Sequence, residues 1–76
     1  MPTIFRYGGF RIVINPLDHP PPHVHVLNAD GYAVIEIETL VVRRYRDMRE
    51  RDVVRAVGIV AEFGDTLLKR WREIHG

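Results

Sequence analysis

The sequence predicts an α+β fold: an antiparallel sheet of four to five strands, built from two hairpins and packed on one face by a C-terminal helix. Three observations support this prediction. β-rich runs fill the first half of the chain, turn residues divide these runs into hairpins, and the apolar spacing becomes helical from about Met48. With 76 residues, of which 46% are apolar, the chain has the length and composition of a single domain over residues 1–76.

Two short β-rich runs, Thr3–Tyr7 and Phe10–Asn15, form the first expected hairpin. The pair Gly8-Gly9 between them suits a two-residue turn, since glycine adopts positive φ angles without strain. Pro16 then ends the sheet, because proline has no backbone N–H to donate to a neighbouring strand. A loop that continues to Pro22 is therefore expected after the second strand.

The stretch from Asp18 to Val26 is the most unusual part of the sequence, because it holds three of the four histidines and three of the five prolines. Each proline fixes φ near about −65° and lacks a backbone donor. Residues 20–22 are therefore expected to form a stiff polyproline II rod that directs the histidines at its ends.

A second hairpin is expected from His23–Leu27 and Tyr32–Ile37, with Asn28–Gly31 as its turn. Leu40–Tyr45 is expected to be a fifth strand, short or irregular because arginines interrupt its apolar run.

The side chains of the second hairpin are expected to divide between two faces. Val24 and Val26 alternate with His23 and His25 along the first strand. The valine face continues as an apolar face on the second strand, so it should pack on the core while the histidines point away from it. A two-residue turn would place His25 opposite Glu36, and a four-residue turn keeps the same faces.

The C-terminal helix is predicted from apolar residues that recur in steps of three and four up to Trp71 and Ile74. Gly64 and Asp65 suit the end of one helix and the start of another, whereas the unbroken phase favours one long helix with at most a kink. Further apolar residues widen the helical stripe beyond what the sheet would cover, which predicts a surface for self-association or for a small protein partner. These residues are Val54, Ala56, Ile59, Ala61, Phe63 and Leu68.

A divalent metal site is the first functional interpretation of the histidines. Histidines at positions i and i+2 of a strand lie on the same side, with Cα atoms about 6.6 Å apart. A nearby carboxylate would complete a site for a divalent metal such as zinc, with His23, His25 and Glu36 as ligands. No other cofactor is expected, because the sequence lacks a phosphate-binding glycine loop and a dinucleotide fingerprint.

General acid–base catalysis without a metal is the second interpretation. His19, His23 and His25 would act on a phosphodiester while arginines hold the phosphate, as in a small ribonuclease. The third and simplest interpretation is structural, with the histidines hydrogen-bonded to Asp18 or a neighbouring glutamate, or forming a protein-binding face. Whether the protein is an enzyme stays open at this point.

Six arginines lie between residues 43 and 55, interrupted by three acidic residues. The simplest interpretation is a solvated helix start in which these charges pair. The alternative is contact with nucleic acid, with Arg43, Arg44, Arg46 and Arg49 as the candidate residues. The sequence has no cysteine, no apolar run of membrane-spanning length and no signal-peptide pattern, so a cytoplasmic protein that does not enter membranes is expected.

Three segments resemble a small bacterial family, the domain of unknown function numbered four-one-six-zero. They are the opening Met1-Pro2-Thr3-Ile4, the core Asp18-His19-x-Pro21-Pro22-His23-x-His25-Val26 and the ending Leu68-x-x-Trp71. The resemblance implies a single α+β domain with no established activity, paired with another small domain of unknown function, numbered two-four-four-two, in suspected toxin–antitoxin modules. Family members usually carry Trp near Phe63 and a polar residue or His near Gly64, where this sequence departs from the pattern.

The favoured hypothesis is a small cytoplasmic interaction protein, one member of a toxin–antitoxin-like pair, that contacts nucleic acid through its arginines. It would form a homo-oligomer or bind a small cognate protein, and the loop residues Asp18, Pro21 and Pro22 are expected to take part in binding. The alternative hypothesis is a histidine-dependent or metal-assisted ribonuclease.

Overall fold

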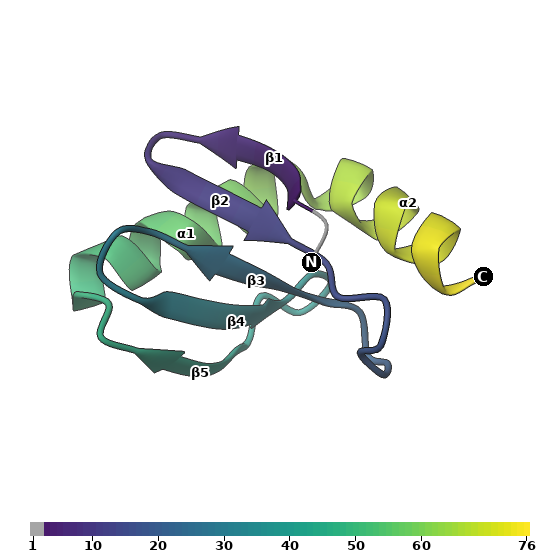
Figure 1. Ribbon diagram of the computed structural model, residues 1–76, viewed down its shortest axis with the longest axis horizontal. Coiled ribbons are helices and arrows are strands. Elements are labelled where there is room, and N and C mark those ends of the chain that lie inside the picture. Colours follow the sequence, from purple (N-terminus) through teal and green to yellow (C-terminus); the bar gives the residue numbers. More distant parts are fainter. Residues whose placement is uncertain (1–2) are drawn as a thin grey trace.

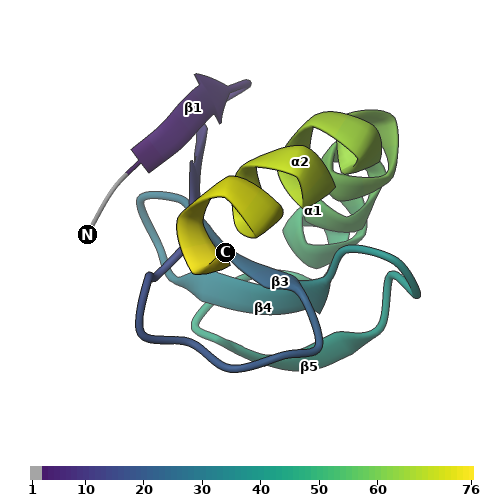
Figure 2. The same cartoon turned by 90° about the vertical axis from the view of Figure 1, so that its right-hand side faces the viewer.

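The computed structural model describes residues 3–76, which form five strands followed by two helices (Figure 1). Met1 and Pro2, which begin the opening segment of the family resemblance, lie outside the described residues. The strands form one antiparallel sheet in sequence order, and both helices lie over the same side of it (Figure 2). The predicted α+β fold is therefore confirmed. The elements are β1 (Thr3–Tyr7), β2 (Phe10–Val13), β3 (His23–Leu27), β4 (Tyr32–Glu36), β5 (Val42–Arg46), α1 (Glu50–Glu62) and α2 (Gly64–His75).

The first hairpin has the predicted two-residue turn. Tyr7 pairs with Phe10, and Gly8 and Gly9 between them have φ angles of 55° and 84°. Two consecutive positive φ angles match the twist of a tight hairpin, which explains the glycine pair. β2 ends at Val13, two residues earlier than expected.

The second hairpin has a four-residue turn, so its register differs from the two-residue alternative. Leu27 pairs with Tyr32, and the side-chain oxygen of Asn28 accepts hydrogen bonds from the N–H groups of Asp30 and Gly31 at 2.9 Å each. Because Asn28 closes the loop through these bonds, His23 lies opposite Glu36 and His25 lies opposite Val34. The predicted division into two faces holds in this register.

The core lies between the sheet and the helices. Val24, Val26 and Ile35 are completely buried, in one apolar cluster with Ala56 and Val60 of α1. The predicted valine face of β3 is therefore the core face. Trp71 of α2 is also buried in this cluster.

The helical segment breaks once, at Phe63, which has φ −103° and ψ 17°. The Phe63 N–H donates to the Ile59 carbonyl at 3.0 Å, and the Phe63 carbonyl accepts from the Leu67 N–H at 2.9 Å. Backbone hydrogen bonding therefore continues through the break and keeps the apolar positions in phase. The Phe63 ring packs edge-on against Phe5 and Tyr7, with centroid distances of 5.0 and 5.2 Å, which ties the helix junction to β1.

The expected excess of apolar helix surface is largely absent. Ala56 and Ile59 are buried, and Phe63 and Leu68 are partly buried against the core cluster. The two segments run in different directions after the break, so α2 covers apolar surface that α1 does not reach (Figure 1). Of the six residues expected to widen the stripe, Val54 (66% exposed) and Ala61 are exposed.

The proline segment is not the extended rod that the sequence predicts. The chain bends at Pro20 and Pro21, and the peptide bond between them is cis. Hydrogen bonds hold the segment instead. The Pro21 carbonyl contacts Nδ1 of His23 at 2.9 Å, and the Pro22 carbonyl accepts from the Ile37 N–H at 3.0 Å.

β5 is short and irregular, as expected. The register shifts where Ile35 pairs with Val42 and Val34 pairs with Arg44, so Arg43 is an extra residue on β5. Such a bulge can turn consecutive side chains toward one face. Among the described residues, no helix is long and apolar enough to cross a membrane.

Gly31 offers a test of the packing between the second turn and β5. A Cβ atom at Gly31 would lie 1.9 Å from the carbonyl oxygen of Arg46, and a backbone atom cannot move aside as a side chain can. We expect Gly31→Ala to lower the free energy of unfolding by about 1–3 kcal/mol, measured by urea denaturation. Gly58→Ala is the matched control, because a Cβ atom added at Gly58 of α1 would have no atom of the described residues within 4 Å beyond its own helix backbone. It should raise the free energy of unfolding by about 0.5–1 kcal/mol; equal effects of the two changes would contradict this account.

Candidate functional site

The candidate site lies on the surface of the sheet that faces away from the core, which we call the outer face. Its side chains follow from the strand register, because directly paired residues of antiparallel strands point to the same side. They are Arg11 and Val13 of β2; His23, His25 and Leu27 of β3; Tyr32, Val34 and Glu36 of β4; and Arg43, Arg44 and Arg46 of β5.

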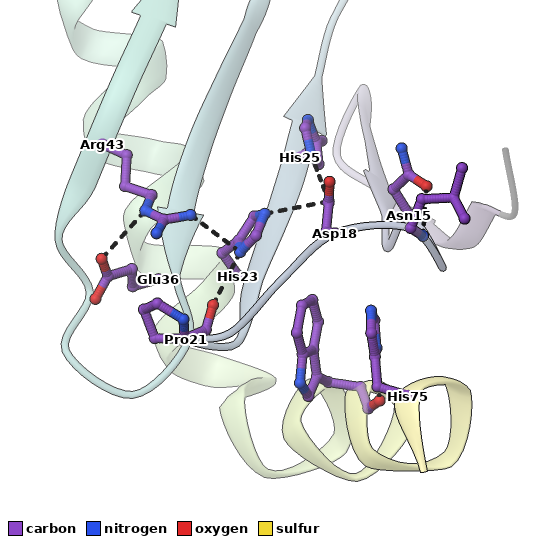
Figure 3. A network of polar contacts seen from close by, with 10 residues as sticks. Asn15, Asp18, Pro21, His23, His25, Glu36, Arg43 and His75 are labelled. Carbon is purple, nitrogen blue, oxygen red and sulfur yellow. Dashed lines mark hydrogen bonds and ion pairs between the residues drawn. The ribbon is translucent and has the colours of Figure 1, made fainter.

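Asp18 brings the two strand histidines together at one end of this face (Figure 3). Its Oδ2 atom lies 3.1 Å from Nε2 of His23 and 3.0 Å from Nε2 of His25. The side chains of His25 and Asp18 are 17% and 22% exposed. One carboxylate oxygen therefore contacts two imidazoles in a partly buried setting. We call Asp18, His23 and His25 the Asp–His cluster.

A turn after β2 directs Asp18 toward β3. The Asn15 side-chain oxygen accepts from the Leu17 N–H at 2.9 Å, and the Asn15 carbonyl accepts from the Asp18 N–H at 3.1 Å. This side chain-to-backbone bonding is typical of Asn in turns. The chain therefore reverses at Asn15 and returns to the start of β3.

The histidines lie opposite the core face, as predicted, but they are much less exposed than a solvent-facing hairpin surface would be. His23 is only 5% exposed. As the first residue of β3 it lies at the end of the sheet, where its ring centroid is 5.3 Å from that of Trp71. His25 is paired with Val13 on one side and Val34 on the other, and both valines are buried.

The ring of His23 has three polar neighbours that no single tautomer satisfies. Its Nδ1 lies 2.9 Å from the Pro21 carbonyl oxygen and 3.2 Å from Nη1 of Arg43. A carbonyl only accepts hydrogen bonds and a guanidinium only donates them. Because the contact with Pro21 is shorter, we assign a proton to Nδ1, which then donates to the Pro21 carbonyl. Nε2 is directed at Asp18, to which it donates when it also carries a proton and presents a lone pair when it does not.

Glu36, which the sequence analysis paired with the histidines, has other partners. Its Oε2 lies 3.3 Å from Nε of Arg43, and its Oε1 accepts from the Thr39 hydroxyl at 2.9 Å. Asp18 supplies the carboxylate of the cluster in its place. His19 is exposed in the loop and is not part of the Asp–His cluster.

Three of the candidate arginines share the outer face with the histidines. Arg44 pairs with Val34, which pairs with His25, so these residues form one cross-strand row. Arg43 reaches the row of His23 and Glu36 because of the bulge in β5. Arg46 lies farther along β5, opposite Tyr32. By contrast, Arg49 immediately precedes α1, which begins at the opposite end of the sheet from the cluster (Figure 1).

Trp71 and His75 of α2 lie next to the cluster, and sequence reasoning did not connect them with it. The ring of His75 stacks on that of Trp71 with a centroid distance of 3.6 Å and an interplanar angle of 17°. Nδ1 of His75 contacts the Trp71 carbonyl at 3.0 Å, and its Nε2 is buried without a hydrogen-bond partner among residues 3–76. The helical spacing correctly placed Trp71 in the core, but spacing carries no signal for a contact with a histidine 48 positions away.

The tautomer of His23 can be tested by long-range ¹H–¹⁵N correlation NMR, which distinguishes a protonated from an unprotonated ring nitrogen. We expect Nδ1 of His23 to carry a proton, because the Pro21 carbonyl can only accept. His19, exposed in the same loop, is the internal reference for a histidine in solvent. An unprotonated Nδ1 on His23 would instead mean that this nitrogen accepts a hydrogen bond from Nη1 of Arg43, which would contradict the assignment of a proton to Nδ1.

Comparisons with known proteins give a family and no function. The family model described as "Domain of unknown function (DUF4160)" matches residues 9–72, a span that includes the Asp–His cluster, the outer-face arginines and Trp71. Searches of curated proteins and of solved structures found no match. Because the family model covers most of the chain, this protein belongs to the DUF4160 family.

Proposed function

We propose that this protein is a ribonuclease from a toxin–antitoxin-like pair, with the Asp–His cluster as its reaction site. The observation that carries the proposal is the shared face: two imidazoles held by one carboxylate lie in cross-strand rows that end in arginines. Imidazoles transfer protons or bind metal ions near neutral pH, and arginines recognise phosphate. Together they supply the groups that phosphodiester cleavage requires.

The arginines lie at a distance that suits a shared phosphate. His25 and Arg44 are separated by one intervening strand, so their backbones are roughly 10 Å apart. Both side chains project from the same face, and the long arginine side chain can approach a phosphate that also reaches the cluster. Arg44 is exposed, whereas Arg43 is held by Glu36. We therefore propose that Arg44 contacts the phosphate directly and that Arg43 positions Glu36 and His23.

The pairing with a cognate protein rests on the family resemblance. The buried residues of the helix stripe, Ala56 and Ile59, do not add support for a partner surface. An interaction protein without catalytic activity is the competing proposal, and it differs in one measurable respect: it predicts binding of a partner but no effect of the Asp–His cluster on RNA.

RNA cleavage by the tag-free protein tests the proposal. We expect His25→Ala to lower the cleavage rate by about 100-fold to 10,000-fold, because it removes a group that acts on the phosphodiester or holds the ion that does. His19→Ala is the matched control, since His19 is exposed in the same loop and lies outside the cluster; it should keep the wild-type rate. Cleavage that persists in a folded His25→Ala variant would remove the ribonuclease proposal, and a wild-type protein that leaves RNA intact would favour the interaction protein.

RNA affinity separates the arginines of the outer face from those elsewhere. Affinity should fall as salt concentration rises, and Arg44→Ala should weaken binding and reduce the slope of log affinity against log salt by about 1. Arg49→Ala is the control, because it removes the same charge at the opposite end of the sheet. Fluorescence anisotropy with a labelled single-stranded RNA measures the affinity and its salt dependence for each variant. Equal losses in the two variants would show that net charge, rather than the outer face, governs binding.

A further inference from the structure

We infer that Asp18, His23 and His25 form a binding site for a divalent transition-metal ion such as Zn²⁺. Each residue offers one ligand atom, and these atoms lie within 4.8 Å of one another. The set contains two imidazole nitrogens and one carboxylate oxygen. Imidazole-rich sets suit zinc, iron, nickel and copper, whereas magnesium and calcium prefer oxygen ligands.

Two of the three distances within the cluster are close to those between ligands of a bound ion. Ligand atoms about 2.1 Å from a metal are roughly 3.0–3.4 Å apart when they occupy adjacent octahedral or tetrahedral positions. Oδ2 of Asp18 lies 3.1 and 3.0 Å from the two Nε2 atoms. The two imidazole nitrogens lie within 4.8 Å of each other, so the side-chain movement needed to place all three atoms around one ion is the one that sets this third separation.

The surroundings of His23 match those of a metal ligand. A ligating histidine usually donates its other ring N–H to a carbonyl or carboxylate, which fixes the ring and directs the free nitrogen at the metal. Here Nδ1 of His23 contacts the Pro21 carbonyl at 2.9 Å, while Nε2 points at Asp18. The ring is also held by burial next to Trp71. This orientation is a second observation, independent of the spacing of the three ligand atoms.

The positive charge of Arg43 near the proposed site is balanced by the carboxylate of Glu36. Nη1 of Arg43 lies 3.2 Å from Nδ1 of His23, and a guanidinium this close would oppose a cation. However, Arg43 is paired with Glu36 through its Nε at 3.3 Å. Asp18 then contributes a negative charge to the ion itself. Because its carboxylate is paired with Arg43, Glu36 does not join the ligand set, although it lies opposite His23.

The arrangement favours a metal over two histidines that act as separate acid and base. In an in-line displacement at phosphorus, the attacking and leaving oxygens lie on opposite sides of the phosphate. Here both Nε2 atoms contact the same oxygen of Asp18, so they converge on one point instead of flanking a substrate. Three protein ligands leave at least one coordination position for water or a phosphate oxygen. The ion would thus serve the proposed ribonuclease, but the site rests on its own geometry and is tested by binding alone.

Zinc titration of the full-length, tag-free protein tests the site. The protein is stripped with a chelating resin and titrated with ZnSO₄ in a calorimeter, and we expect one ion per chain. Asp18→Asn and His25→Gln should each weaken binding by at least about tenfold. His19→Gln is the matched control for loss of a histidine, because His19 is exposed in the loop that carries Asp18 and lies outside the cluster. Glu62→Gln, at an exposed carboxylate at the end of α1, is the control for loss of one negative charge. Both variants should bind zinc as the wild type does.

Three further measurements keep the test decisive if a variant folds poorly. Circular dichroism identifies an unfolded variant, and the wild type alone should show the visible absorption bands of four- or five-coordinate Co²⁺ and a zinc-dependent rise in its unfolding temperature. A wild type that binds neither Zn²⁺ nor Co²⁺ would overturn the inference. So would binding that survives Asp18→Asn but is lost with His19→Gln. Stoichiometric binding without RNA cleavage would support the site and contradict only the proposed function, whereas RNA cleavage by a wild type that binds neither ion would contradict only the site.

Discussion

The burial of Val24 and Val26 determines where the functional groups of this protein lie. Both side chains are packed in the core, and successive residues of a strand point to opposite faces, so His23 and His25 must lie together on the outer face. On a simple hairpin they would be surrounded by solvent. The loop that follows β2 turns at Asn15 and returns, so that Asp18 meets both rings. A core packing requirement and a loop reversal thus create one partly buried cluster.

The irregularity of β5 connects the arginines with this cluster. A regular strand would turn Arg43 and Arg44 to opposite faces, but the bulge lets Arg43 reach Glu36 while Arg44 pairs with Val34. The guanidinium of Arg43 then pairs with the carboxylate of Glu36, which lies opposite His23. Asp18 is therefore the acidic residue that contacts the histidines. The local disruption of one strand pair therefore influences which acidic residue belongs to the Asp–His cluster, and it adds positive charge beside that cluster without an unpaired guanidinium next to His23.

The parts of this structure that depend on nearby residues were predictable from the sequence. Gly8-Gly9 specified a two-residue turn, and the alternation around Val24 specified which face the histidines take, because both effects act within a few residues. The structural interpretation of the histidines named Asp18 as a partner, and the structure shows this contact. The meeting of both rings at one Asp18 oxygen, the contact of Trp71 with His23 and the burial of His23 depend on segments that meet only after folding. Glu36 was the natural choice of carboxylate because the register places it opposite a histidine. Its side chain instead pairs with Arg43, which reaches it because of a bulge in β5 that no local sequence pattern indicates. The bends at Pro20 and Pro21 likewise replace the expected rod, since hydrogen bonds from His23 and Ile37 hold the following carbonyls.

The central claim is that Asp18 holds the imidazoles of His23 and His25 so that all three converge on a single cation. Anomalous diffraction at the zinc edge from crystals grown with Zn²⁺ tests it most directly. The account predicts one strong peak about 2.0–2.2 Å from Oδ2 of Asp18 and from Nε2 of both histidines. A peak at His19, at His75 or at Glu36, with the Asp18 cluster intact and without density for an ion, would contradict it.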